Sequence, residues 1–210
     1  RPGVYLPIIY LVFIWVAFGV AYVMVPPLTS EILNIPTSDA GMLIILPAVL
    51  GTALGAFIVE KFAKRFGKKA FIALGIFVIG ITGMVISLIP EAKEIVRNGN
   101  PEYFDFIKSI FKNGIIAILL AFIGLGAMFM IAPAQTLLQE NTEKDMMGTV
   151  FGFLNMLTNM LNTLPVLIVG YIADLIDIKI VLFTISSFVV VFGISNVIML
   201  YVKRKRLARL

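Results

Sequence analysis

Asparagine side chains recur at helical spacing in the apolar stretch 148–173, and these amides are the groups in the sequence best suited to chemistry. Two glycines extend their pattern, and intervals of four, three, four and three place all five residues on one stripe of a helix: Gly148, Gly152, Asn155, Asn159 and Asn162. An amide donates and accepts hydrogen bonds but carries no charge. Such a stripe in an apolar segment must face protein or water. Interhelical hydrogen bonding and the lining of a solute cavity are both open interpretations.

Other polar and aromatic side chains fit the same two interpretations. Gln135 and Gln139 lie one helical turn apart, beside Pro133. Trp15 and Tyr22 are candidate aromatic contacts for a substrate. Tyr22 and Tyr10 also lie near the ends of their predicted span, where a tyrosine can anchor a helix at the membrane interface. The predicted cavity or interdomain residues are therefore Trp15, Tyr22, Gln135, Gln139, Asn155, Asn159 and Asn162.

The absent residue types exclude several kinds of chemistry. The sequence has no cysteine and no histidine, which removes disulfides, thiolate nucleophiles and imidazole acid–base catalysis. No Asp, Glu, Lys or Arg lies in the centre of any long apolar run, whereas a proton-coupled carrier normally needs a carboxylate within the membrane. We therefore expect no enzymatic activity, no cofactor and no metal site, and we expect any titrating group for proton coupling to lie elsewhere in a larger assembly.

Composition identifies the elements that must position these residues. Of the 210 residues, 60% are hydrophobic and 14% are charged, which is outside the range of soluble globular proteins. A helix of about 20 apolar residues crosses the roughly 30 Å hydrocarbon core of a bilayer. We predict an all-α polytopic membrane protein, one six-helix domain over residues 1–210, with spans at about 5–25, 40–59, 70–89, 114–138, 148–173 and 180–202.

The basic residues predict orientation rather than nucleic-acid binding. The net charge is +5, and alternate assignment of the loops places 12 Lys and Arg residues on one side and 5 on the other. The richer side carries the cluster 61–69 and the cluster 203–209, and an even number of spans puts both chain ends there. By the positive-inside rule that side is cytoplasmic. We expect an integral protein of a prokaryotic plasma (inner) membrane with both termini in the cytoplasm and no nucleic-acid partner.

Small residues and prolines indicate how the spans pack. In residues 40–59 small residues recur at four-residue spacing, which allows helices to approach closely: Gly41, Ala48, Gly51, Thr52, Gly55 and Ala56. Pro47, Pro133 and Pro165 each fall within a predicted span. Because proline lacks a backbone N–H, each is expected to interrupt the hydrogen-bond ladder of its helix.

The order of several short motifs resembles the C-terminal six-helix half of a major facilitator superfamily transporter, most similar to the macrolide-efflux type. The motifs are PAQTLLQE at 133–140, GTVFG at 148–152 followed by Asn155, then Pro165, and GYIAD at 170–174. That family usually has an arginine before Gly148, whereas this chain has Met147. The resemblance covers essentially the whole chain.

Two segments are similar to the superfamily's loop signature. Gly170 and Asp174 match its Gly-x-x-x-Asp portion, and the cluster Gly67, Lys68 and Lys69 is a more degenerate copy. These copies recur three helices apart, which is consistent with the three-plus-three inverted repeats of each half of this fold. The resemblance implies that the first and fourth helices face a central cavity, the second and fifth face the other half, and the third and sixth lie outermost.

The resemblance implies a secondary transporter, an antiporter exporting amphipathic or drug-like small molecules by alternating access. Its expected partners are the lipid bilayer, the small-molecule substrate, and the N-terminal six-helix half of the same transporter or a second copy of this chain. A sequence that begins at Arg1 is expected to be a piece of a 12-helix carrier. The alternatives are a homodimeric six-helix transporter and a membrane assembly or scaffold module without transport activity.

Overall fold

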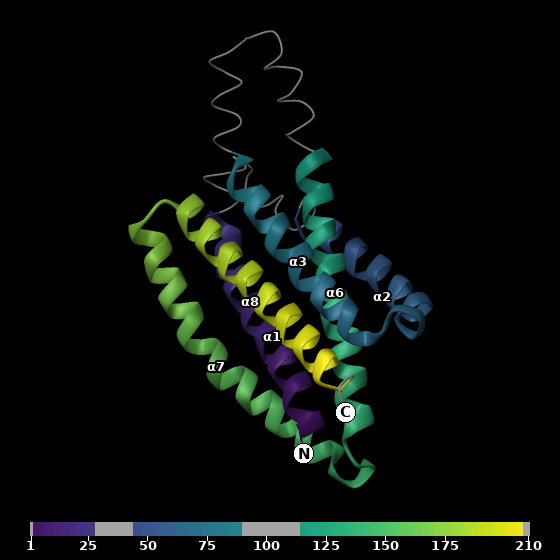
Figure 1. The fold of residues 1–210 in the computed structure, drawn as a ribbon. Helices are drawn as coiled ribbons and strands as arrows, with labels where there is room; N and C mark the ends of the chain where they lie inside the picture. The colour runs from purple at the N-terminus through teal and green to yellow at the C-terminus, as the bar shows by residue number, and fades with distance from the viewer. Residues whose placement is uncertain (1, 28–43, 90–113, 208–210) are drawn as a thin grey trace.

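The computed structural model describes residues 2–27, 44–89 and 114–207, and this part of the chain consists of helices and short connections (Figure 1). Within these ranges, six long helices and one short 3-10 helix occur in this order: α1 (Pro2–Pro27), α2 (Leu46–Phe66), α3 (Lys68–Ser87), α6 (Ile116–Asn141), η5 (Lys144–Met146), α7 (Met147–Leu175) and α8 (Ile178–Leu207). Each long helix contains a stretch long and apolar enough to cross a membrane. The fold is therefore all-α, as the composition predicts.

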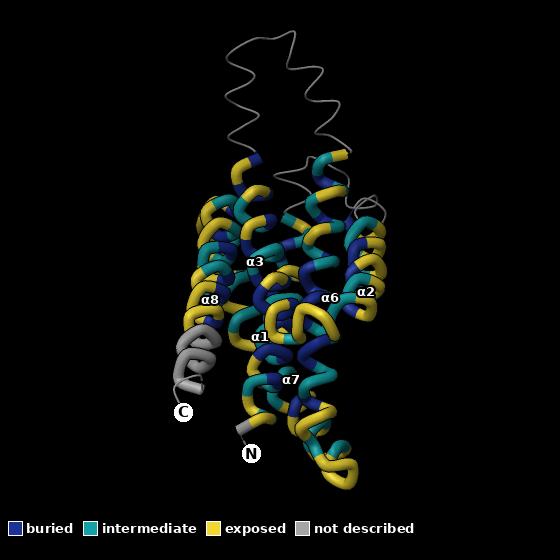
Figure 2. Tube along the Cα trace, turned by 45° about the vertical axis from the view of Figure 1, so that its right-hand side comes forward, coloured by how far each residue is buried: buried dark blue, intermediate teal, exposed yellow. Residues whose placement is uncertain are grey.

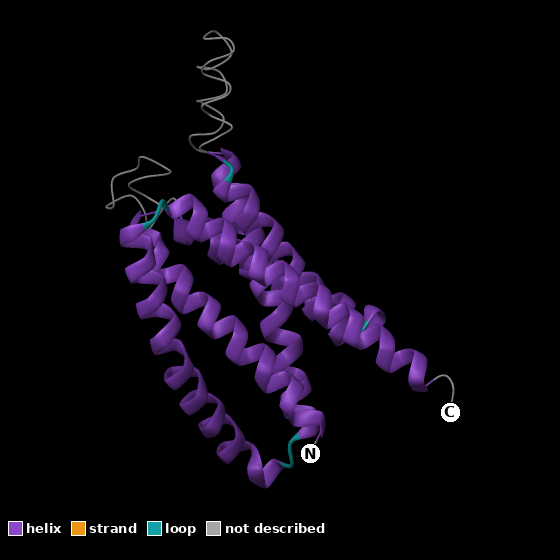
Figure 3. Cartoon of the chain, turned by 60° about the vertical axis from the view of Figure 1, so that its left-hand side comes forward, coloured by secondary structure: helices purple, strands orange, loops and turns teal. Residues whose placement is uncertain are grey.

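Helix α6 lies at the centre of the arrangement. It packs against α1, α2 and α3, while α8 covers the other side of α3 and α7 packs mainly on α1. Figure 3 shows α7 at the edge of the bundle, next to α1 and apart from α2. One long face of α7 is consequently left without cover from the rest of the described chain.

Consecutive helices alternate in direction, so the connections gather at two ends. The start of α1, the α2–α3 turn and the α6–α7 connection lie toward one end, and the α7–α8 turn lies at the other (Figure 1). Gly67 makes the tight α2–α3 turn with φ 87°, a backbone conformation that residues with a Cβ rarely adopt. The two copies of the loop signature therefore lie at opposite ends of the bundle.

Helix α2 departs from its predicted range at its C-terminal end. It continues beyond residue 59 through the basic cluster to Phe66, because lysine and arginine favour helix and no helix-breaking residue occurs before Gly67. Pro47 lies in the first turn of α2 and follows the π-helical residues Ile44 and Ile45. The expectation that Pro47 interrupts the hydrogen-bond ladder of a helix stays a prediction. Pro133 and Pro165 lie inside α6 and α7.

Small residues allow α2 and α6 to approach at backbone distance. Gly51 and Gly55 are buried, and a Cβ added to Gly51 would overlap the carbonyl oxygen of Ala121. From the other side, a Cβ on Gly124 would overlap the carbonyl oxygen of Ala48. The predicted packing role of the small residues in α2 is confirmed for these positions. Gly41 lies outside the described residues.

Candidate functional site

The asparagines of α7 have two different environments. Asn155 and Asn159 are exposed, and so are Gly148 and Gly152 on the same stripe. The most apolar 18-residue window of α7 contains no buried residue, and Figure 2 shows how much of this helix is exposed or only partly covered. The exposed face of α7 is defined here as the surface around Asn155 and Asn159. It carries two side-chain amides with no protein covering them in the described structure.

Asn162 belongs instead to the contact between α7 and α1. It is half-buried and packs against Gly19, where an added Cβ would overlap the amide group. Its Oδ1 is buried and accepts no hydrogen bond from the described residues, and the same holds for the hydroxyl of Thr158. Asn162 reaches α1 because Gly19 has no side chain at the point of contact.

Trp15 and Tyr22 are exposed on α1, to 43% and 79% respectively. On the helical wheel both lie between Leu11, which packs in a cluster with residues of α6, and Gly19, which faces α7. The structure thus places both aromatic rings on the sector of α1 that neither α6 nor α7 covers. Their contact with a substrate stays a prediction.

Gln135 and Gln139 lie on α6 near the end that leads into α7. Gln135 is half-buried, and Gln139 is exposed one turn later. Neither packs into the buried clusters of the bundle. These amides therefore come from α6, whereas the exposed asparagines come from α7, and both helices contact α1.

Tyr10 has a role that its position in the sequence did not indicate. Its side chain is 4% exposed, and its hydroxyl accepts a hydrogen bond of 2.6 Å from Nδ2 of Asn196 on α8. Burial and this bond contradict the interface-anchor role considered for Tyr10. A polar Asn196 within an apolar run was the available signal, because a buried amide requires a hydrogen-bonding partner.

The loop-signature residues occupy three kinds of position. Lys68, the first residue of α3, forms an ion pair with Glu140 near the end of α6, and Lys69 is exposed. Gly170 lies within α7 beside Val23 of α1, at the end opposite Gly67. Asp174 falls in the last turn of α7, and its side chain lies outside the described part of the structure.

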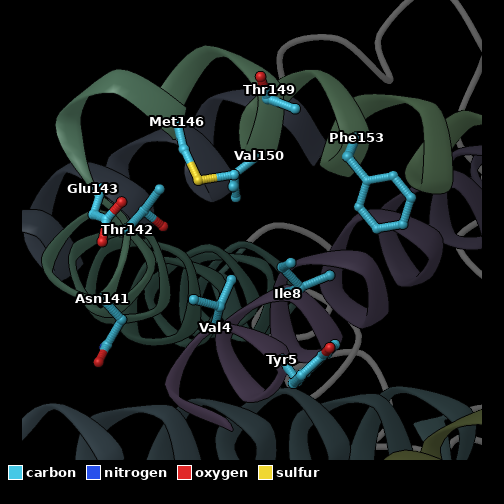
Figure 4. A pocket seen from close by; sticks show the side chains of 10 residues that line it. All are labelled: Val4, Tyr5, Ile8, Asn141, Thr142, Glu143, Met146, Thr149, Val150 and Phe153. Atoms are coloured by element: carbon cyan, nitrogen blue, oxygen red, sulfur yellow. The ribbon is translucent and has the colours of Figure 1, made fainter. Parts of the chain in front are cut away.

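A cleft of about 490 Å³ opens between the first turns of α1 and α7 and the connection after α6 (Figure 4). Ten residues line it, and their side chains are mostly apolar or aromatic: Val4, Tyr5, Ile8, Asn141, Thr142, Glu143, Met146, Thr149, Val150 and Phe153. Glu143 supplies a carboxylate at this cleft. The lining thus combines apolar side chains with a few polar groups, as ligand clefts commonly do.

The six apolar helices and the uncovered polar positions define a polytopic α-helical membrane protein. A family model described as Major Facilitator Superfamily matches residues 6–209, and the chain belongs to this family. The family consists of secondary transporters, which places the chain among transport proteins rather than enzymes. No curated protein and no solved structure gave a significant match.

Proposed function

We propose that this chain forms one six-helix half of a secondary transporter that exports amphipathic, drug-like small molecules as an antiporter. The other wall of the transport cavity comes from a second six-helix unit, either the N-terminal half of the same carrier or a second copy. Alternating access then consists of one unit rocking against the other around a central cavity.

The exposed amides of α7 carry this proposal. Asn155 and Asn159 lie on a face that no other described helix covers. An amide left in hydrocarbon without hydrogen bonds costs about 4 kcal/mol or more in transfer free energy. Water in a cavity, or polar groups of a second unit, removes this cost. The face around Asn155 and Asn159 is therefore better suited to a cavity or an interdomain surface than to lipid.

The substrate class is inferred from the exposed aromatic rings of α1 and from the apolar cleft beside its first turns. Trp15 and Tyr22 expose large rings on α1, and the cleft beside α1 is lined mainly by apolar side chains with Glu143 among them. Such surfaces bind lipophilic molecules by burying apolar area, and the polar side chains Asn141, Thr142 and Thr149 of the cleft suit the polar part of such a molecule. Amphipathic compounds are consequently the favoured class.

The main competing function is a six-helix assembly module that does not transport. It would use the same amides to hold a partner helix. Removing one amide affects them differently, because a packing contact contributes to stability whereas a cavity contact contributes to flux.

Replacing Asn159 with leucine in the full carrier separates these functions. We expect flux per folded molecule to fall about fivefold, the effect of losing about one hydrogen bond to the solute or its water, with little change in thermal stability in detergent. Met160→Leu is the matched control, since Met160 is also exposed on α7 but outside the amide stripe. Unchanged flux together with an altered melting temperature for Asn159→Leu supports the assembly module and contradicts the transport role.

A further inference from the structure

We propose that a groove between α2 and α3 binds one anionic phospholipid, with an acyl chain between the helices and the headgroup phosphate beside Lys64 and Lys69. This site is separate from the exposed face of α7 and from the cleft beside α1. It consists of an apolar groove and a basic pocket that share residues at the end where α2 turns into α3.

The apolar groove exists because α2 and α3 each pack on α6 much more extensively than on one another. It has a volume of about 500 Å³ and is lined only by apolar residues: Ile58, Phe62, Phe66, Ala70, Phe71, Leu74 and Phe129. Phe71 and Phe129 are buried, with their rings edge to face at 5.1 Å. Phe66 and Leu74 are exposed. The groove thus offers a fixed aromatic floor and apolar walls that suit a hydrocarbon chain.

The basic pocket continues this groove toward the end of the bundle. It has a volume of about 450 Å³, and its lining contains the three lysines nearest to the turn: Ala63, Lys64, Phe66, Gly67, Lys68, Lys69, Ala70 and Leu137. Phe66 and Ala70 line both the pocket and the groove. An amphiphile can therefore occupy both at once, with its charged end among the lysines.

The charges around this pocket leave two lysines for an anion. Lys68 is already paired with Glu140. Lys64 and Lys69 are exposed, and neither forms an ion pair with a carboxylate in the described part of the chain. Glu60 lies one turn before Lys64 on α2, so the cluster is not purely basic. The amino-terminal end of α3, which begins at Lys68, adds the positive end of a helix dipole.

Neighbouring side chains fit the headgroup layer of a membrane. The Lys61 ammonium lies 5.7 Å from the centre of the Phe62 ring, and the Arg65 guanidinium lies 5.8 Å from that of Phe66. Cations held over aromatic rings at a helix end are typical of the boundary between lipid tails and water. Basic pockets between membrane helices at this level recognise anionic headgroups. A free phosphate ion would use the lysines but leave the apolar groove without an occupant.

Native mass spectrometry of the full-length protein in a mild detergent tests the site. With equal amounts of phosphatidylglycerol and phosphatidylcholine added, we expect one phosphatidylglycerol to be retained in preference. The double change Lys64→Gln and Lys69→Gln should weaken its retention about 25-fold, which is fivefold for each lysine. Lys144→Gln, which removes an exposed lysine of the α6–α7 connection, should leave retention unchanged.

Two further measurements separate a lipid from a simple anion. Ala70→Phe keeps every charge but fills the junction of groove and pocket, and it should also reduce phosphatidylglycerol retention. Glycerol 3-phosphate carries the anionic group without acyl chains and should not displace the lipid at equal concentration. Equal retention of the two lipids, unchanged retention in the double variant or in Ala70→Phe, or displacement by glycerol 3-phosphate would each overturn the proposal. Melting temperatures near that of the unmodified protein establish that the variants remain folded.

Discussion

Asn196 of α8 donates a hydrogen bond of 2.6 Å to the hydroxyl oxygen of Tyr10 of α1, and both side chains are buried. Phe13 and Phe192, one turn away on each helix, stack with ring centres 4.2 Å apart. These two contacts hold one face of α1 against α8, while α1 packs mainly on α6 and α7. In this arrangement Tyr10 is buried, whereas Trp15 and Tyr22 are exposed.

Removing the Tyr10 hydroxyl should destabilise the bundle. In Tyr10→Phe the amide of Asn196 loses its one hydrogen bond to a described side chain, and its Oδ1 already accepts none from the described residues. We expect the free energy of unfolding in detergent to fall by about 1 to 2 kcal/mol. Tyr5→Phe is the control, because Tyr5 is 65% exposed. A loss no larger than that of the control would show that the buried hydrogen bond contributes little.

Glycines at the α2–α6 contact should tolerate substitution much less than glycines on α7. Gly51→Ala places a methyl group against the carbonyl oxygen of Ala121 and should cost about 1 to 3 kcal/mol in stability. Gly152→Ala meets no atom within 4 Å and should be neutral or stabilising by up to about 1 kcal/mol, since alanine favours helix. Thermal unfolding of both variants provides the comparison, and equal losses would contradict the described packing.

The number of helices and their approximate positions follow from composition, because a span requires a long apolar run whatever its neighbours are. Which side of a helix is covered does not follow from local sequence. Asn155, Asn159 and Asn162 form one stripe in the sequence, yet only Asn162 meets α1, because Gly19 leaves room for it. Tyr10 and Asn196 are 186 residues apart, so no periodicity connects them. The groove between α2 and α3 likewise depends on tertiary packing, because both helices pack on α6 and leave a space between them.

The distribution of basic residues predicts which end of the bundle faces the cytoplasm. Lys64 lies by the α2–α3 turn and Ile176 by the α7–α8 turn, at opposite ends of the bundle (Figure 1). In a cysteine-free background, we expect an impermeant thiol reagent to label Ile176→Cys but not Lys64→Cys in intact cells. Both should react after the cells are opened. The reverse pattern in intact cells would invert the assigned orientation.

Water accessibility of Asn159 in the assembled carrier tests most directly whether the exposed face of α7 lines a transport cavity. Single cysteines are placed at Asn159 and at Ile194, an exposed position on α8 at a similar distance from the α7–α8 turn. Both are treated with a charged thiol reagent in membranes. A water-filled cavity predicts labelling at Asn159→Cys that the transported solute reduces, and no labelling at Ile194→Cys, which meets lipid. If neither cysteine is labelled, and adding the solute changes the labelling of neither, the result would contradict a cavity on this face.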